Sequence, residues 1–450
     1  MVVLVALPTL AEPDAASEKP EKQRKPRLGL ARDFERKLRD AYEARVEELG
    51  PGRWHRTRTH SFDPDLTPEQ REEIRRLEAI GYVDGSTEVR ASGVVLHVKR
   101  RAHPGLNFFT SGHAPEAILM DMDGHILHRW HYAFRDVWPE YPPEELLPST
   151  QFWRRAYVYP NGDLLAIFSG LGMIKLDKDS QLIWARPIQA HHDLEVMPGG
   201  DIYVLTREAH IIPRLNQHIP ILEDFITILD TEGREKSRVS VLGAFENSGF
   251  AEIWERSPIR TGDIFHTNTV EVLDGRISER LRAFGRGNVL ISSPVLDTLA
   301  VVDLTREKVM WAHRGAFKRQ HDPKVLQNGN LLLFDNQSSA SGSSVIEFDP
   351  KTGEGKWEYR GTEERPFFSL TCGAADRLPN GNTLITESDG GRAFEVTQQA
   401  EVVWEFYNPH RAGDNREFIA TLFEVIRLPS SFLETAGLKP TAEENAAQGD

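Results

Sequence analysis

Residues 299–311 read LAVVDLTREKVMW: an apolar strand that ends in Asp303, a short polar turn, and a second strand that ends in Trp311. Two short apolar runs around a polar turn are typical of a β-hairpin. The unit recurs along the chain, and in its last copy Thr397 replaces the aspartate. Recurrence of one supersecondary unit indicates a repeat architecture rather than a β-sandwich, which does not require equivalent units. The other copies are residues 118–130, 174–184, 226–239, 345–357 and 393–404.

A second hairpin unit alternates with the first. Residues 325–334 (VLQNGNLLLF) place Asn-Gly between two apolar strands, where both turn residues tolerate the positive φ of a tight hairpin. Two hairpins per repeat make a four-stranded antiparallel sheet, so the sequence predicts an all-β fold, a six-bladed β-propeller. The further copies are residues 158–167, 196–205 and 377–386, with a degenerate copy over 270–292.

The propeller is predicted to occupy residues 96–430. Residues 1–27 form a signal-like apolar segment and a polar linker, which indicates a periplasmic or secreted protein although the basic n-region of a signal is missing. Residues 28–95 are predicted to form a short, charged helical N-terminal segment, in which Thr67-Pro68 has the pattern of a helix start. Residues 431–450 are predicted to be a disordered tail.

Composition excludes several classes of function. The chain of 450 residues has 54 Lys and Arg against 68 Asp and Glu, a net charge of −14, which argues against nucleic acid as a partner. The single cysteine, Cys372, excludes a disulfide within the chain and every cysteine-rich metal site. No apolar stretch is long enough to span a bilayer.

Histidines recur where the repeats approach the propeller axis. The first strand of each blade lines the central channel, and the position about five residues before the hairpin turn holds His192, His321 or Asn268 in three blades. His266 lies two residues before Asn268, on the same face of a regular strand. These residues are predicted to converge, whereas Asp193 and Asp322 are predicted to face away from them and to support the structure.

Two chemistries suit such a cluster. Neutral imidazoles bind divalent metals. Alternatively, one imidazole acts as a nucleophile while the others stabilise negative charge on a transferring group. No Gly-rich phosphate loop and no G-x-S-x-G elbow is present, which argues against a nucleotide-dependent transferase and a serine hydrolase.

The chain resembles the bacterial arylsulfotransferases (aryl-sulfate sulfotransferases) from about residue 104 to residue 404. The resemblance implies a six-bladed propeller that needs no cofactor and no nucleotide donor (PAPS). It also implies transfer of a sulfuryl group from an aryl sulfate ester to a phenolic acceptor through a sulfohistidine. The motifs that carry it are residues 104–107 (PGLN), 121–124 (DMDG), 191–193 (HHD), 266–268 (HTN), 320–322 (QHD) and 328–336 (NGNLLLFDN).

The resemblance also assigns roles to single residues. His321 matches the nucleophilic histidine of the family, and His192, His266 and Asn268 match residues that bind the sulfuryl group. His191 is the less favoured member of its doublet. The chain departs from the family at one point.

The family has an arginine in the stretch that corresponds to residues 290–303, and here Ser293-Pro294 stands in its place. Arg154, Arg314 and Arg319 are the alternatives. Without a guanidinium, two other functions stay open: a non-catalytic ligand-binding propeller, or a metal-dependent propeller enzyme that uses the same histidines.

Overall fold

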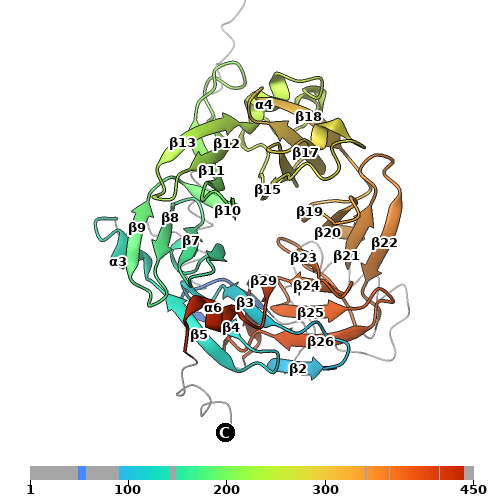
Figure 1. The fold of residues 1–450 in the computed structure, drawn as a ribbon. Helices are drawn as coiled ribbons and strands as arrows, with labels where there is room; N and C mark the ends of the chain where they lie inside the picture. The colour runs from blue at the N-terminus through green and yellow to red at the C-terminus, as the bar shows by residue number, and fades with distance from the viewer. Residues whose placement is uncertain are drawn as a thin grey trace, which may run out of the picture.

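The computed structural model describes residues 49–56, 91–141, 148–339, 342–363, 365–414 and 416–439. The described residues form six sheets of four or five strands. Figure 1 looks along the axis around which these sheets are arranged. The fold is therefore the predicted all-β, six-bladed propeller. The signal-like segment, the linker and most of the predicted helical N-terminal segment lie outside the described residues.

Three sheets follow one another in the first half of the ring. The strands of each sheet are given in their spatial order, from the strand nearest the axis outward. They are β29 (Leu422–Leu428), β3 (Leu106–Ser111), β4 (Glu116–Met120) and β5 (Ile126–His131); β6 (Arg155–Val158), β7 (Leu164–Phe168), β8 (Gly172–Leu176) and β9 (Leu182–Arg186); and β10 (Ala190–Val196), β11 (Ile202–His210), β12 (Ile221–Leu229) and β13 (Glu235–Ser240), with β14 (Gly262–Asp263) beside β12.

The other three sheets complete the ring. They are β15 (Thr269–Val272), β16 (Val289–Ser293), β17 (Thr298–Asp303) and β18 (Lys308–His313); β19 (His321–Val325), β20 (Leu331–Ser339), β21 (Gly342–Phe348) and β22 (Gly355–Arg360); and β23 (Ala374–Arg377), β24 (Thr383–Glu387), β25 (Arg392–Val396), β26 (Val402–Tyr407) and β2 (Gly93–His97).

The ring closes between its two ends. Strand β29 pairs antiparallel with β3, with Val425 opposite Phe109. The innermost strand of this sheet therefore comes from the C-terminal part of the chain, and its other three strands come from residues 106–131. This pairing joins strands that are more than 300 residues apart in sequence, so the ring stays closed through backbone hydrogen bonds.

The recurring aspartate and tryptophan have structural roles. Asp121 Oδ1 accepts hydrogen bonds from the backbone N–H groups of Asp123 and His125, 2.8 and 2.9 Å away, which fixes the turn after β4. Trp130 Nε1 donates to the carbonyl of Gly162 in the next sheet at 2.9 Å. Equivalent bonds to the next sheet are made by Trp184, Trp357 and Trp404.

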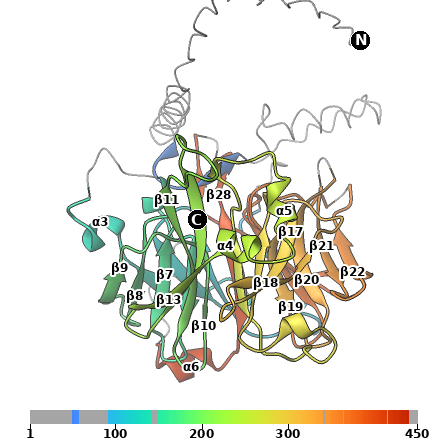
Figure 2. The ribbon, with the colours of Figure 1, turned by 90° about the horizontal axis from the view of Figure 1, so that it is seen from above.

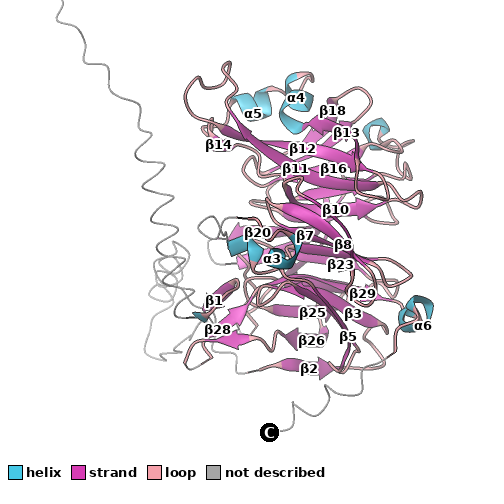
Figure 3. Ribbon diagram, turned by 90° about the vertical axis from the view of Figure 1, so that its left-hand side faces the viewer, coloured by secondary structure: helices cyan, strands magenta, loops and turns pink. Residues whose placement is uncertain are grey.

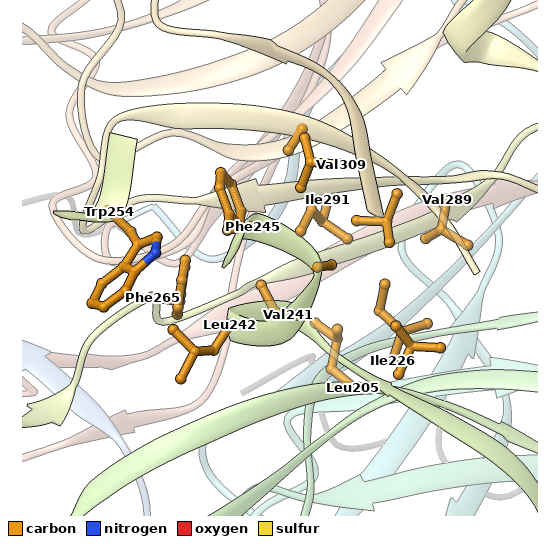
Figure 4. Packing of buried hydrophobic residues seen from close by; sticks show 14 of the residues in the cluster. Leu205, Ile226, Val241, Leu242, Phe245, Trp254, Phe265, Val289, Ile291 and Val309 are labelled. Carbon is orange, nitrogen blue, oxygen red and sulfur yellow. The ribbon is translucent and has the colours of Figure 1, made fainter. Parts of the chain in front are cut away.

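Apolar side chains fill the space between neighbouring sheets. One buried cluster lies between the β10–β13 and β15–β18 sheets, and Figure 4 shows it around Phe245 and Ile291. The helix α4 (Val241–Glu246) closes this cluster from outside, and Ser240 caps its N-terminus by accepting from the backbone N–H of Gly243. The remaining short helices are α3 (Phe134–Val137), α5 (Glu252–Glu255), η2 (Pro148–Thr150) and η3 (Arg282–Phe284).

Additional elements lie on the two faces of the ring. A small sheet of β1 (Trp54–Arg56), β28 (Phe418–Ala420) and β27 (Arg411–Ala412) lies on one face, and α6 (Phe432–Ala436) lies on the other (Figures 2 and 3). Phe432, Ala436 and Leu438 are buried in the cluster between the first two sheets. Residues 431–439 therefore pack on the propeller, which differs from the predicted disordered tail. None of the described helices is long and apolar enough to cross a membrane.

Candidate active site

The inner strands are irregular where the histidines lie. His192 and His266 have φ angles of 53° and 51°, in the left-handed region that non-glycine residues rarely occupy. The register of β10 against β11 shifts between Ala190 and Leu194. Such bulges re-aim side chains, and positive φ values of this kind gather at functional sites. The predicted strand alternation does not apply to His266, because β15 begins only at Thr269.

His321, the first residue of β19, is fixed in one tautomer. Its Nδ1 lies 2.8 Å from Oδ1 of Asn336 and 2.9 Å from the carbonyl oxygen of Arg319. The oxygen and nitrogen of the Asn336 amide cannot be exchanged, because Nδ2 donates to the carbonyls of Ser369 and Cys372 at 2.7 and 2.8 Å. Both neighbours of Nδ1 are thus acceptors, so Nδ1 carries the proton and Nε2 keeps its lone pair.

The free nitrogen of His321 is buried and has no hydrogen-bond partner among the described residues. Burial lowers the pKa of His321 to about 3, and the positive charge of Arg154 acts in the same direction against the Asn336 hydrogen bond. The imidazole is therefore neutral near pH 7. An oriented, uncharged imidazole with an unused lone pair is suited to nucleophilic attack.

Two further histidines face this region. The rings of His192 and His266 meet edge to face, with centroids 4.6 Å apart. His192 Nδ1 lies 2.8 Å from Nδ1 of His191, and burial holds the pKa of His192 well below its usual value. His266 Nδ1 donates to Asp263 Oδ2 at 2.5 Å, and the side chain of His266 is 39% exposed. The Asp263 carboxylate can stabilise a protonated His266, so this pair can deliver and recover a proton.

Asn268 connects its blade to the nucleophile's blade. Its Nδ2 donates to the carbonyl of Gln320 at 3.0 Å, and its Oδ1 accepts from the Thr269 hydroxyl at 3.1 Å. Gln320 directly precedes His321, so Asn268 holds the start of β19 in place. The predicted contact of Asn268 with a sulfuryl oxygen stays a prediction.

The aspartates that follow the two histidines bridge neighbouring blades. Asp193 Oδ2 accepts from the backbone N–H of Val270 at 2.9 Å, and Asp322 Oδ2 accepts from that of Ala375 at 3.0 Å. Each carboxylate satisfies a backbone donor on the innermost, unpaired edge of the next sheet. The geometry agrees with the supporting role that the sequence indicated.

The histidines do not have the spacing of a metal site. Among the described residues, ligand atoms of three or more His, Cys, Asp or Glu residues gather within 4.8 Å of one another at His113, Glu116 and His410. His192, His266 and His321 do not form such a group.

One of the three alternative arginines, Arg154, is buried and directly precedes β6. Ser293, at the position of the family arginine, donates its hydroxyl to the carbonyl of Phe265 at 2.6 Å. Arg314 and Arg319 are exposed, whereas Arg154 is 9% exposed and lies over the ring of Phe423, 5.0 Å from its centroid. Burial is the main cause of the low pKa values of His192 and His321, and the positive charge of Arg154 lowers both further.

Residues 156–409 match the family model described as arylsulfotransferase (ASST). The chain belongs to the arylsulfotransferase family. The matched segment contains all four predicted site residues, and Arg154 lies two residues before it. Membership supports an arylsulfotransferase-type function in general. No curated protein sequence matches the chain.

Solved structures resemble the fold at low sequence identity. A protein of unknown function from Bacteroides caccae is 12% identical with a TM-score of 0.44, over 72% of this chain and 98% of that one. The β-propeller domain of Cps50 (Swd1) from Myceliophteria thermophila is 10% identical with a TM-score of 0.41, over 76% and 98% of the two chains. A streptogramin B lyase is 13% identical with a TM-score of 0.40, over 74% and 94%.

Beyond Asp193 and Asp322, the inner strands enclose a cavity of about 750 Å³. Glu195 and Glu271 line it beside Lys324. Burial raises the pKa of Glu195 to about 7 and that of Glu271 to about 8. These carboxyl groups are therefore partly or largely protonated near neutral pH, and the fold becomes less stable as they ionise.

The variant Glu271→Gln is expected to gain stability over the wild type as the pH rises from 5 to 9. The folded pKa of Glu271 lies above its unfolded value, so its stabilising contribution is complete below pH 4.5 and is lost as the pH rises through about 8. Glutamine keeps an oxygen for the Val325 N–H, which Glu271 binds at 3.0 Å, and does not ionise. The difference should be on the order of 4–5 kcal/mol at pH 9, because the pKa rises from 4.5 to about 8 and each pKa unit corresponds to about 1.4 kcal/mol.

Urea unfolding of both proteins at several pH values measures this difference. The exposed Glu255→Gln is the matched control and should give a flat difference. A flat difference for Glu271→Gln as well is the result that contradicts the prediction.

Proposed function

We propose that the protein transfers a sulfuryl group from an aryl sulfate ester to a phenol, without PAPS, through a sulfohistidine on Nε2 of His321. The observation that carries this proposal is the buried lone pair of Nε2, which has no partner in the described part of the chain and is fixed by the two carbonyl acceptors at Nδ1. Family membership supports the reaction class. The geometry around His321 supports this residue as the nucleophile.

In the first half-reaction, Nε2 of His321 attacks sulfur and the bond from sulfur to the aryl oxygen breaks. The leaving phenolate takes a proton from His266, whose positive charge the Asp263 carboxylate had stabilised at 2.5 Å. The ring of His321 becomes formally cationic when the N–S bond forms. Its Nδ1–H remains bonded to the carbonyls of Asn336 and Arg319, which stabilise that charge.

The second half-reaction uses the same groups in reverse. A phenol binds in place of the first product and gives its proton to His266 as its oxygen attacks sulfur. The N–S bond breaks, the new aryl sulfate leaves, and His321 returns to the neutral Nδ1–H tautomer. Sulfuryl transfer resembles phosphoryl transfer, in which catalysis is chiefly positioning and stabilisation of charge on the peripheral oxygens.

Release of 4-nitrophenol from 4-nitrophenyl sulfate, with and without added phenol, tests this function. Steady release is expected only with phenol, because the sulfuryl-enzyme needs an acceptor, and double-reciprocal plots at several phenol concentrations should be parallel. Phenyl sulfate should accumulate in equal amount. Release that ignores phenol would indicate a hydrolase, and no release by folded protein with any aryl sulfate would leave the binding-propeller alternative.

A further inference from the structure

Arg154 carries a buried charge that the described residues do not neutralise. Among them, its guanidinium makes no hydrogen bond or ion pair, and its close contact is the face of Phe423. The neighbouring arginines are occupied: Arg53 donates to Thr371 Oγ1 at 2.6 Å, and Arg155 lies 2.9 Å from Asp193 Oδ1. Burying an unpaired cation is costly, so such a group persists where function requires it.

Among the side chains whose charges act on Arg154, the carboxylate is that of Asp193, and two others are the cations Arg53 and Arg155. Its charge acts on His192 and His321, which are neutral near pH 7. That carboxylate has another partner, because Asp193 pairs with Arg155. The titratable and charged groups around the cluster are Arg53, Arg155, Asp193, Arg207, Asp224, Asp263, Cys372 and the imidazoles of residues 191, 192, 266 and 321.

We propose that Arg154 binds the peripheral oxygens of the transferring group, in place of the arginine missing at Ser293-Pro294, and that its single unpaired charge selects monoanionic sulfate esters over dianionic phosphate esters. The identity of the ligand rests on the proposed function. The assignment of Arg154 as an oxyanion-binding residue rests on its burial and its lack of a partner.

The selectivity follows from charge balance. An aryl sulfate carries one negative charge, which the one guanidinium neutralises. A phosphate monoester carries close to two negative charges above its second pKa of about 6, so one buried negative charge would stay uncompensated. Below that pKa the phosphate ester is a monoanion and should bind more like the sulfate ester.

Ligand binding measured in a variant that cannot transfer the sulfuryl group tests the role of Arg154 independently of catalysis. In a His321→Ala background, calorimetry with 4-nitrophenyl sulfate should show ~10- to 100-fold weaker binding for Arg154→Gln, the range expected for one or two charge-assisted hydrogen bonds. Arg154→Lys should keep part of the affinity. At pH 7.5 the parent should bind 4-nitrophenyl phosphate at least ~10-fold more weakly than the sulfate, and the gap should narrow at pH 5.5.

Stability distinguishes a binding role from a structural one. Because Arg154 has no partner in the described residues, Arg154→Met should unfold at the same temperature as the wild type or higher, whereas loss of a structural arginine lowers it. Guanidinium ion should restore part of the activity of Arg154→Ala by occupying the space over Phe423. The exposed Arg256→Gln, 77% exposed at its side chain, is the control.

The outcomes separate the two proposals. Unchanged affinity in a folded Arg154→Gln or Arg154→Lys protein, or equal binding of the two esters at pH 7.5, overturns the inference. Binding that depends on Arg154 in a protein that transfers no sulfuryl group overturns the proposed function alone. Transfer that is insensitive to Arg154 overturns the inference alone.

Discussion

His321→Ala is expected to abolish sulfuryl transfer, with kcat/KM for 4-nitrophenyl sulfate reduced at least ~10³-fold, because the variant lacks the nucleophile of a covalent route. No other imidazole in the cluster has the same arrangement. Nδ1 of His192 lies within hydrogen-bond distance of Nδ1 of His191, and Nδ1 of His266 is hydrogen-bonded to Asp263. Replacement of His321 should therefore not be compensated by a neighbour. The initial rate of 4-nitrophenol release with saturating phenol measures the loss.

Two further measurements make this result specific. The wild type, quenched during turnover with 4-nitrophenyl sulfate, should carry one sulfuryl group on the peptide that contains His321, and the alanine variant should carry none. His125→Ala is a matched control, because His125 is 59% exposed on the turn after β4 and pairs with Asp121. A labelled His321→Ala protein, or one that retains a tenth of the wild-type rate, contradicts the assignment of the nucleophile.

The repeat pattern predicted the fold because each repeated residue acts locally. Asp121 bonds to backbone groups two and four residues later, and Trp130 reaches only the next sheet. Strand β29, from the C-terminal part of the chain, pairs with β3, because closing the ring removes two free sheet edges. Local rules of this kind are readable from one sequence.

The site was only partly predictable because its decisive contacts are not local. Alignment of the repeats identified His192, His266, Asn268 and His321; in the structure the rings of His192 and His266 meet, and Asn268 bonds to the carbonyl of Gln320, the residue before His321. The positive φ values of His192 and His266 leave no signal in a strand pattern.

The partners that set protonation come from other segments. Asn336, which fixes the His321 tautomer, lies 15 residues after it on β20, the strand that pairs with β19. Arg154 was one of three arginines among which the sequence could not choose, and burial separates it from the exposed Arg314 and Arg319. Burial thus distinguishes arginines that motif spacing could not rank.

Arg427→Met is expected to destabilise the propeller by about 3–5 kcal/mol, because it leaves the Glu395 carboxylate buried without its cation. The side chains of Arg427 and Glu395 are 1% and 0% exposed and lie 3.1 Å apart. Arg427, on the closing strand β29, also donates to Oδ1 of Asn107 at 2.9 Å and to the carbonyl of His103. The pair therefore joins three segments at the closure of the ring. Urea unfolding measures the loss.

A double variant separates the pair's geometry from its charge. Glu395→Gln combined with Arg427→Met removes both charges, and glutamine keeps an oxygen for the backbone N–H of His103, which Glu395 binds at 2.7 Å. This variant should recover part of the stability lost in Arg427→Met. Arg234→Met, which breaks an exposed pair with Asp230, should leave the free energy of unfolding nearly unchanged, because water screens exposed ion pairs. Equal losses for the buried and the exposed pair would show that the closure does not depend on Arg427, and that backbone pairing of β29 with β3 holds the ring by itself.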